Sequence, residues 1–133
     1  MIKLRKMYSL TEDLDFTWRL RNENRKYFFH NKIISRTKHW EWFMEMQEDK
    51  KLWFYIIWLG KIRIGTISYK EKEIGNIIID KKYRRKGYLR KAISLLLKKH
   101  KGEAFLKVLP NNMGAIKAYK ALGFREKETI LWK

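Results

Sequence analysis

Residues 112–124 are the most informative part of the sequence, and they read Asn112-Met-Gly-Ala115-Ile116-Lys-Ala-Tyr119-Lys-Ala-Leu122-Gly123-Phe124. Asn112 is a good helix cap, and the apolar side chains that follow it recur at helical spacing. Gly123 is typical of the position just past a helix end. The stretch therefore predicts a short amphipathic helix that carries Tyr119 on its inward face.

Upstream of it, a β-branched strand leads into a basic loop and then into a helix. The strand, residues 74–79, ends at Asp80, and the loop reads Arg84-Arg-Lys-Gly87-Tyr88. From Leu89 an apolar stripe follows at helical spacing. A loop at a helix N-terminus offers free N–H groups and the positive end of the helix dipole, which bind phosphate. The second glycine and the Lys-Ser/Thr pair of a P-loop are missing, so we expect a phosphate site of a different kind.

The rest of the chain predicts two helices near its start and several strands. Ser9-Leu-Thr-Glu12 has the form of a capping box, and Ser35 or Thr37 caps a second helix with Trp40, Phe43 and Met44 on one side. Strands are expected at residues 2–4, 52–59, 62–69, 104–109 and 124–132. The order β-α-α-β-β-β-α-β-α-β, without repeat or linker, predicts one mixed α/β domain over residues 1–133.

Composition narrows the classes of function. The chain has 133 residues, 45% of them apolar, which is enough for a sizeable core. It has no cysteine, so disulfides, cysteine-based metal sites and a cysteine nucleophile are excluded. The net charge is +18, and ten Lys or Arg but no acid lie between Lys81 and Lys101, which fits either anionic partners or a solvated, lysine-rich surface. We expect a cytoplasmic protein, because no signal peptide or membrane-spanning run is recognisable.

The motif at residues 112–124 resembles the N-x-x-A-I-x-x-Y-x-x-x-G-F signature of GNAT-type N-acetyltransferases. Arg84 and Gly87 match the acetyl-CoA motif R-x-x-G-x-G/A of that superfamily, although Leu89 stands where Gly or Ala is usual. The resemblance covers the whole chain in element order and its last half in motif detail. It implies a single domain with a twisted, mostly antiparallel sheet, a V-shaped splay between strands 4 and 5, and about four flanking helices.

The resemblance implies acetyl-CoA as cosubstrate and no metal. The amides of residues 85–90 would bind the pyrophosphate, and the strand edge at residues 77–79 would pair with the pantetheine and stabilise the oxyanion. The residues implied in coenzyme binding are Ile77, Ile78, Ile79, Arg84, Arg85, Lys86, Gly87, Tyr88, Leu89, Arg90, Asn112, Ala115 and Tyr119.

Two residues are candidates for catalysis. Tyr119 matches the family tyrosine that protonates the leaving thiolate, and its place on the inward stripe is equally that of a core residue. Glu73 is spaced like the strand-borne base of protein-acetylating members, and it also fits a solvated turn. Strand alternation would put Glu73, Gly75, Ile77 and Ile79 on one face. His30, His39 and Asp80 are weaker candidates, and the three histidines of the chain show no metal-ligand spacing.

The acceptor is expected to contact the first half of the chain. Trp18-Arg-Leu-Arg-Asn22 and Lys38-His39-Trp40-Glu-Trp42-Phe43 are similar to GNAT enzymes that acetylate nucleotide-linked amino sugars, by direct attack of the amine in a ternary complex. Aromatic rings beside positive charge suit a base and a diphosphate, and they also fit core packing. The alternatives are acetylation of a protein N-terminus or lysine, and, ranked last, a non-catalytic nucleic-acid-binding domain. A homodimer is left open.

Overall fold

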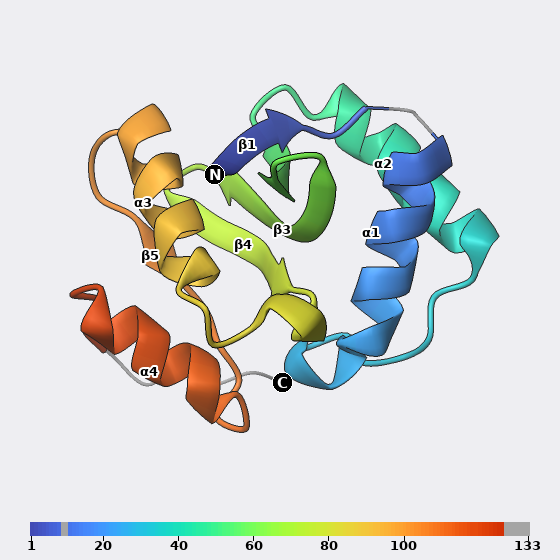
Figure 1. Ribbon diagram of the computed structural model, residues 1–133. Coiled ribbons are helices and arrows are strands. Elements are labelled where there is room, and N and C mark those ends of the chain that lie inside the picture. Colours follow the sequence, from blue (N-terminus) through green and yellow to red (C-terminus); the bar gives the residue numbers. More distant parts are fainter. Residues whose placement is uncertain (9–10, 127–133) are drawn as a thin grey trace.

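The computed structural model describes residues 1–8 and 11–126 (Figure 1). Most of the helices and strands follow the hydrophobic periods of the sequence. In chain order they are β1 (Ile2–Lys6), α1 (Thr11–Glu23), α2 (Arg36–Glu48), β2 (Trp53–Leu59), β3 (Ile62–Lys70), β4 (Glu73–Ile79), α3 (Tyr88–Lys99), β5 (Phe105–Leu106) and α4 (Met113–Ala121). Short 3-10 turns cover Arg25–Tyr27 and Lys81–Tyr83. None of the described helices is long and apolar enough to cross a membrane.

The five strands form one sheet in the order β1-β2-β3-β4-β5. Neighbouring strands are antiparallel except for β4 and β5, which are parallel. The parallel pairing consists of Glu73 with Phe105 and Ile74 with Leu106. Beyond Ile74, the two strands separate. The sheet is therefore mostly antiparallel and splayed between its fourth and fifth strands, as the sequence predicts.

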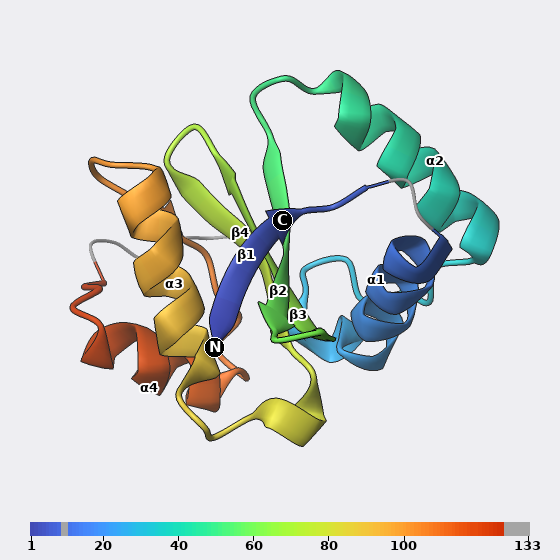
Figure 2. The same ribbon diagram turned by 45° about the horizontal axis from the view of Figure 1, so that its top comes forward.

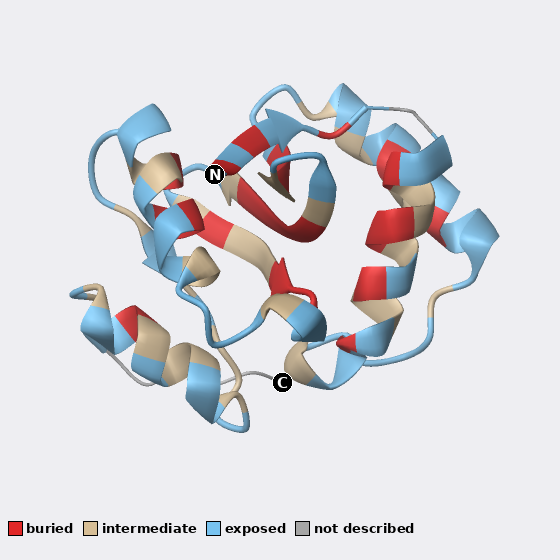
Figure 3. Cartoon of the chain, viewed as in Figure 1, coloured by how far each residue is buried: buried red, intermediate tan, exposed pale blue. Residues whose placement is uncertain are grey.

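The helices cover the two faces of the sheet in pairs (Figures 1 and 2). On one side, α3 and α4 pack over a core that includes Ile64, Ile67, Ile74, Ile93 and Leu96. On the other side, α1 and α2 cover a second core of Met7, Phe16, Leu20, Phe43, Phe54, Ile56 and Ile78. Figure 3 shows the buried residues concentrated in the strands, while the outer surfaces of the helices are exposed.

An extra residue in β4 changes which side chains share a face. Ser68 pairs with Gly75 and Thr66 with Ile78, so two steps on β3 oppose three on β4. The surplus residue is Asn76, whose φ of 48° lies in the left-handed region that asparagine tolerates. The prediction that Glu73 and Gly75 share a face with Ile77 and Ile79 is therefore wrong, because the bulge reverses the alternation between them.

Helix boundaries and caps agree well with the sequence. The side chain of Ser35 accepts a hydrogen bond from the amide of Lys38, which confirms the predicted cap of α2. Asn112 caps α4 in the same way, through the amide of Ala115, and Gly123 follows the helix with a φ of 95°. The predicted capping box at Ser9 and Leu10 lies outside the described residues.

Three expectations about elements need correction. On α2, Phe43 is fully buried, but Trp40 and Met44 are each 47% exposed, because His39 takes the second inward position. The strand predicted at residues 104–109 is reduced to Phe105–Leu106, since the splay removes its partner. A strand is also predicted at residues 124–132. Its first three residues, 124–126, are not in a strand, and residues 127–132 lie outside the described part of the chain.

Gly65 allows β4 to approach β3 closely at the bulge. A Cβ at this position would lie 2.2 Å from the carbonyl oxygen of Ile78. We expect Gly65→Ala to lower the free energy of unfolding by about 3 kcal/mol, because the clash is with backbone that cannot move without disturbing the bulge. The control is Gly114→Ala in α4, where a Cβ meets nothing within 4 Å and helix propensity rises by about 1 kcal/mol. Urea unfolding of both variants checks this; equal stabilities would contradict it.

Candidate functional site

The loop between β4 and α3 has the geometry of an anion site. Arg85 and Gly87 have positive φ values of 63° and 80°, and Gly87 is the N-cap of α3. The first hydrogen bond of the helix runs from the amide of Lys91 to the carbonyl of Gly87, at 3.2 Å. Among the described residues, no acceptor is recorded for the amides of residues 85–90. Free donors, the positive end of the helix dipole and the basic side chains of Arg85 and Lys86 therefore coincide at this loop.

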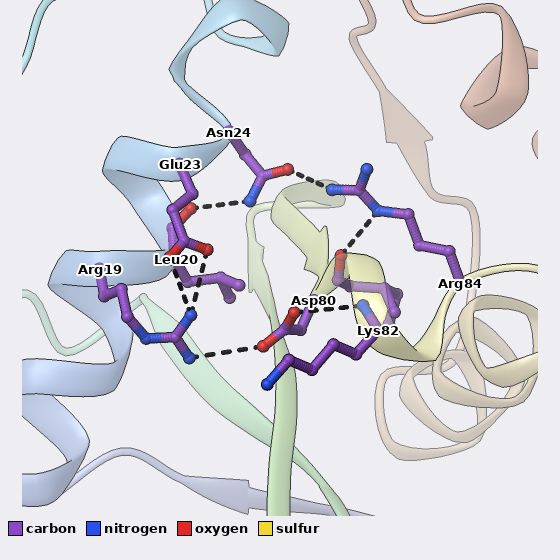
Figure 4. A network of polar contacts seen from close by, with 8 residues as sticks. Arg19, Leu20, Glu23, Asn24, Asp80, Lys82 and Arg84 are labelled. Atoms are coloured by element: carbon purple, nitrogen blue, oxygen red, sulfur yellow. Dashed lines mark hydrogen bonds and ion pairs between the residues drawn. The ribbon is translucent and has the colours of Figure 1, made fainter.

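Arg84 fixes this loop to the rest of the protein (Figure 4). Its Nε donates to the carbonyl oxygen of Ile79 at 2.9 Å, and its guanidinium also donates to the side-chain oxygen of Asn24. Asn24 is buried and donates in turn to the carbonyl of Leu20 at 2.9 Å. The guanidinium of Arg84 is thus hydrogen-bonded to the end of β4 and to the segment after α1, and these two bonds fix the position of the loop.

Asp80, a weak candidate for catalysis, has a structural role in the same network. Its buried carboxylate accepts a hydrogen bond from the amide of Lys82 at 3.3 Å and caps the 3-10 turn that follows. Its other oxygen lies 3.4 Å from the guanidinium of Arg19, which also pairs with Glu23 at 3.0 Å (Figure 4). The carboxylate is therefore used to hold the chain reversal at the end of β4.

Tyr119 lies in the core between α4 and the sheet. It belongs to the same apolar cluster as Ile79, with Ile77 and Ala115 packed against that cluster. Its ring meets Phe124 edge-on, with centroids 6.2 Å apart. Burial raises the pKa of Tyr119 to about 12, so the hydroxyl keeps its proton at neutral pH. The structure thus brings Tyr119 to the face of β4 that carries Ile77 and Ile79.

Glu73 is placed apart from that group. It lies at the start of β4 with a side chain 40% exposed, and its carboxylate is 4.0 Å from the ammonium of Lys107. It pairs across the sheet with Lys70, on the face opposite to Ile77 and Ile79. The two catalytic candidates therefore stand on opposite faces of β4.

A pocket of about 520 Å³ opens on the α1 and α2 side of the sheet. Its floor includes Thr66 of β3 with Asn76 and Ile78 of β4, so the bulge forms part of its wall. The carbonyl of Asn76 accepts a hydrogen bond from the Thr66 hydroxyl at 2.7 Å, and its side-chain amide donates to Ser68 at 2.9 Å. Sequence reasoning missed Thr66 and Asn76; the one local signal was a Gly-Asn pair inside a strand, which is typical of a bulge.

His39 lines the pocket and is neutral. Its Nε2 is 2.8 Å from the hydroxyl oxygen of Thr17. The single proton of that hydroxyl is donated to the carbonyl of Asp13, at 2.9 Å. The imidazole is therefore the donor in this pair, which leaves Nδ1 as an acceptor. Its ring stacks on Trp42 with centroids 4.9 Å apart. Burial, helped by the charge of Arg21, lowers the pKa of His39 to about 4.

The motif around Trp18 and Asn22 supports the pocket from behind. The indole of Trp18 donates to the carbonyl of Ile34 at 2.7 Å. Asn22 bonds both the carbonyl and the amide of Ile34, at 2.9 and 2.8 Å. These side chains hold the segment 30–34 that closes one side of the pocket. Of the aromatic residues expected near the acceptor, Trp42 lines the pocket and Trp40 does not.

The described residues contain no group of three His, Asp or Glu side chains that could hold a metal ion. A splayed sheet, with a loop of free amides at a helix N-terminus on one side and a pocket on the other, is the arrangement of an acetyltransferase fold. The acetyltransferase (GNAT) family model matches residues 9–124, and the chain belongs to this family. Its members are acetyl-CoA-dependent N-acetyltransferases, which makes acetyl-CoA the cosubstrate and the chain a transferase.

Solved structures agree with this assignment. A domain from Methanocaldococcus jannaschii DSM 2661 is 26% identical, with a TM-score of 0.80 over 96% of this chain and 90% of that one. Spermidine N-acetyltransferase from Vibrio cholerae, solved with CoA and spermine, is 24% identical, with a TM-score of 0.82 over 96% and 82%. AAC(6')-Iy, solved with the bisubstrate analogue CoA-S-monomethyl-acetylneamine, is 18% identical, with a TM-score of 0.75 over 100% and 97%. The sequence matches no curated protein.

The neutral state of His39 makes stability depend on pH. Its pKa is about 4 in the folded chain against a usual value of 6.5, so the unfolded chain binds the extra proton between these values. The contribution of neutral His39 to the free energy of unfolding is complete above pH 6.5, and it is lost as the pH falls toward 4. We expect His39→Gln to have a flatter dependence of Tm on pH in this window, measured by thermal scans. An unchanged slope would contradict the assignment; His30→Gln, at an exposed position, is the control.

Proposed function

We propose that this chain transfers the acetyl group of acetyl-CoA to a primary amine by direct attack in a ternary complex, with a nucleotide-linked amino sugar as acceptor. The observation that carries the proposal is the position of the β4 bulge. Asn76 and Ile78 face the pocket under α1 and α2, while Ile77 and Ile79 face α3 and α4 with Tyr119. One strand therefore separates an acceptor side from a coenzyme side, and the reacting groups would meet at its edge.

The coenzyme side fits a pyrophosphate. The free amides of residues 85–90 point from a helix start whose loop carries several Lys and Arg, and Gly87 leaves open space where a Cβ would stand. Leu89 is half-buried against the α3 core, so it does not reduce the space at Gly87. Beyond Ile74 the edge of β4 is free to pair with an extended group such as pantetheine. An N–H of this edge would then stabilise the oxyanion.

Tyr119 would act as the acid of the reaction. As the amine nitrogen bonds to the thioester carbon, the carbon–sulfur bond breaks and the thiolate needs a proton. The Tyr119 hydroxyl is protonated at neutral pH, so it can donate a hydrogen bond to the sulfur as negative charge develops there and then supply the proton, which the tyrosinate regains from water. Asn112 and Ala115 would contribute by fixing the first turn of α4, so that the tyrosine stays directed at the cleft.

The proton that leaves the amine needs a different route. The Glu73 carboxylate is outside the lining of the pocket, so we propose that it receives the proton through intervening water.

The acceptor assignment rests on the shape and chemistry of the pocket. The stacked rings of His39 and Trp42 offer an aromatic wall, and the charged lining residues are Arg21, Lys32 and Lys38. Such a wall suits the base and diphosphate of a nucleotide sugar. The Vibrio and AAC(6')-Iy structures contain an amine and an acetylated aminoglycoside analogue, which supports an amine as the attacking group.

We also propose that residues 1–133 act as one domain in the cytoplasm, where acetyl-CoA is available.

Coenzyme binding is tested by a thermal scan. Acetyl-CoA at about a hundred times its Kd should stabilise the fold by about 3 kcal/mol, a shift of several degrees in Tm. Gly87→Asp should abolish the shift, since a carboxylate would stand where the pyrophosphate binds. Gly102→Asp, at the far end of α3 and also at a positive φ, should keep it. Absence of a shift in the wild type would overturn the proposed function.

Tyr119→Phe separates catalysis from packing. The ring stays in the core, so Tm should change little, whereas kcat should fall about a hundredfold because the thiolate loses its acid. The matched control is Tyr55→Phe, which removes a hydroxyl bonded to His100 at 2.9 Å, away from the site. It should cost about 1 kcal/mol of stability and leave kcat unchanged. Undiminished turnover of Tyr119→Phe would remove this residue from the mechanism.

A further inference from the structure

One buried nitrogen of Arg21, an arginine that lines the pocket, lacks a hydrogen-bond partner. Within the described part of the chain, Nη1 of Arg21 is the buried side-chain nitrogen or oxygen that makes no hydrogen bond. The other end of the guanidinium is fixed: Nη2 donates to the carbonyl of His30 at 3.1 Å, and the group lies 3.5 Å from the ring centre of Phe28. Burial lowers the pKa of Arg21 to about 10, which leaves it charged at neutral pH.

Three of the four acidic residues of α1 pair with arginines other than Arg21. Asp13 pairs with Arg63 at 2.8 Å, Asp15 with Arg36 at 2.5 Å, and Glu23 with Arg19 at 3.0 Å. Three carboxylates on the same helix thus bind other arginines. The pocket lining itself contains no Asp or Glu, and it adds Lys32 and Lys38 to the positive charge.

A buried hydrogen-bond donor without an acceptor destabilises the fold unless a ligand supplies the acceptor. Leaving a buried polar group without a partner costs about 1–3 kcal/mol, and more when the group is charged. A guanidinium presents its N–H groups in a planar fork that matches the two oxygens of a carboxylate or phosphate. Arg21 lines the pocket with one end of its guanidinium held and with its buried Nη1 unpaired, an arrangement suited to binding an oxyanion.

We propose that Arg21 binds an oxyanion carried by the amine acceptor, so that the enzyme selects anionic amines and rejects polycationic ones. This inference rests on the proposed function, and it makes Arg21 a specificity-determining residue. In a nucleotide-linked amino sugar the oxyanion is the diphosphate; a carboxylate offers the same two oxygens. A polyamine entering the pocket would meet Arg21, Lys32 and Lys38 without a compensating carboxylate.

The binding test uses calorimetry on the CoA-saturated protein, which keeps the coenzyme site filled. Pyrophosphate and malonate are the probes, for the phosphate and carboxylate sources respectively. We expect at least one of them to bind, and Arg21→Met to weaken it at least tenfold. Arg25→Met, an exposed arginine just beyond the same helix, should bind as the wild type does. Wild-type protein that binds neither probe, or equal binding by Arg21→Met, overturns the inference.

A second measurement needs no variant and covers the case that Arg21→Met does not fold. The wild type is assayed with acetyl-CoA and four amines: glucosamine, glucosamine 6-phosphate, a UDP-linked amino sugar and spermidine. The phosphorylated amines should exceed glucosamine at least tenfold in kcat/KM, and spermidine should be the poorest. Spermidine or glucosamine as the best acceptor overturns the inference but leaves the proposed acetyl transfer intact. Failure of coenzyme binding would overturn the proposed function, and anion binding at Arg21 is then measured by the same calorimetry on wild type and Arg21→Met without coenzyme.

Discussion

The extra residue at Asn76 in β4 is the constraint on which both sides of the site depend. Hydrogen bonds from Thr66 and to Ser68 hold it, and Gly65 allows the neighbouring strand to come close enough for this pairing. Without the bulge, alternation would turn Ile77 away from the α3 core and the pocket would lose one wall. Because the bulge reverses the faces, a single strand lines the pocket with Asn76 and Ile78 and faces α3 and α4 with Ile77 and Ile79. The separation of the two sides is thus a consequence of one backbone conformation.

Arg84 connects these two sides through α1. Its guanidinium joins the carbonyl of Ile79 to the side chain of Asn24, and Asn24 is bonded to Leu20 in the last turns of the helix. The same helix carries Thr17 and Arg21 into the pocket. A displacement of the loop at Gly87 would therefore be resisted by the helix that shapes the opposite side. The side chain of Arg84 thus fixes the loop through Ile79 and Asn24, while the backbone amides of the loop stay available to an anion.

Local patterns predicted the elements of the fold well, and long-range pairing limited the rest. Helical stripes and caps such as Ser35 and Asn112 are short-range features, so α2, α3 and α4 were located correctly. The length of β5 depends on where β4 departs from it, which no window of sequence contains. The predicted face of Glu73 is wrong because the alternation of side chains along β4 does not continue through the bulge at Asn76. The unpaired nitrogen of Arg21 could not be predicted from the sequence either. It depends on the pairing of Asp13, Asp15 and Glu23 with other arginines, and that pairing is set by the fold.

Positive charge in the pocket is partly shielded from water at Arg21. A net charge of +18 is tolerated where lysines are solvated, but Arg21 is partly desolvated and His39 must remain neutral beside it. The apolar residues below them, Leu20, Phe43 and Ile56, are almost completely buried and offset this cost through packing. An oxyanion entering the pocket would satisfy Arg21 and lower the potential at His39, so part of its binding free energy is the removal of a penalty already present in the fold. The proposed selectivity for anionic acceptors would therefore use the free energy cost of the unpaired Nη1 of Arg21.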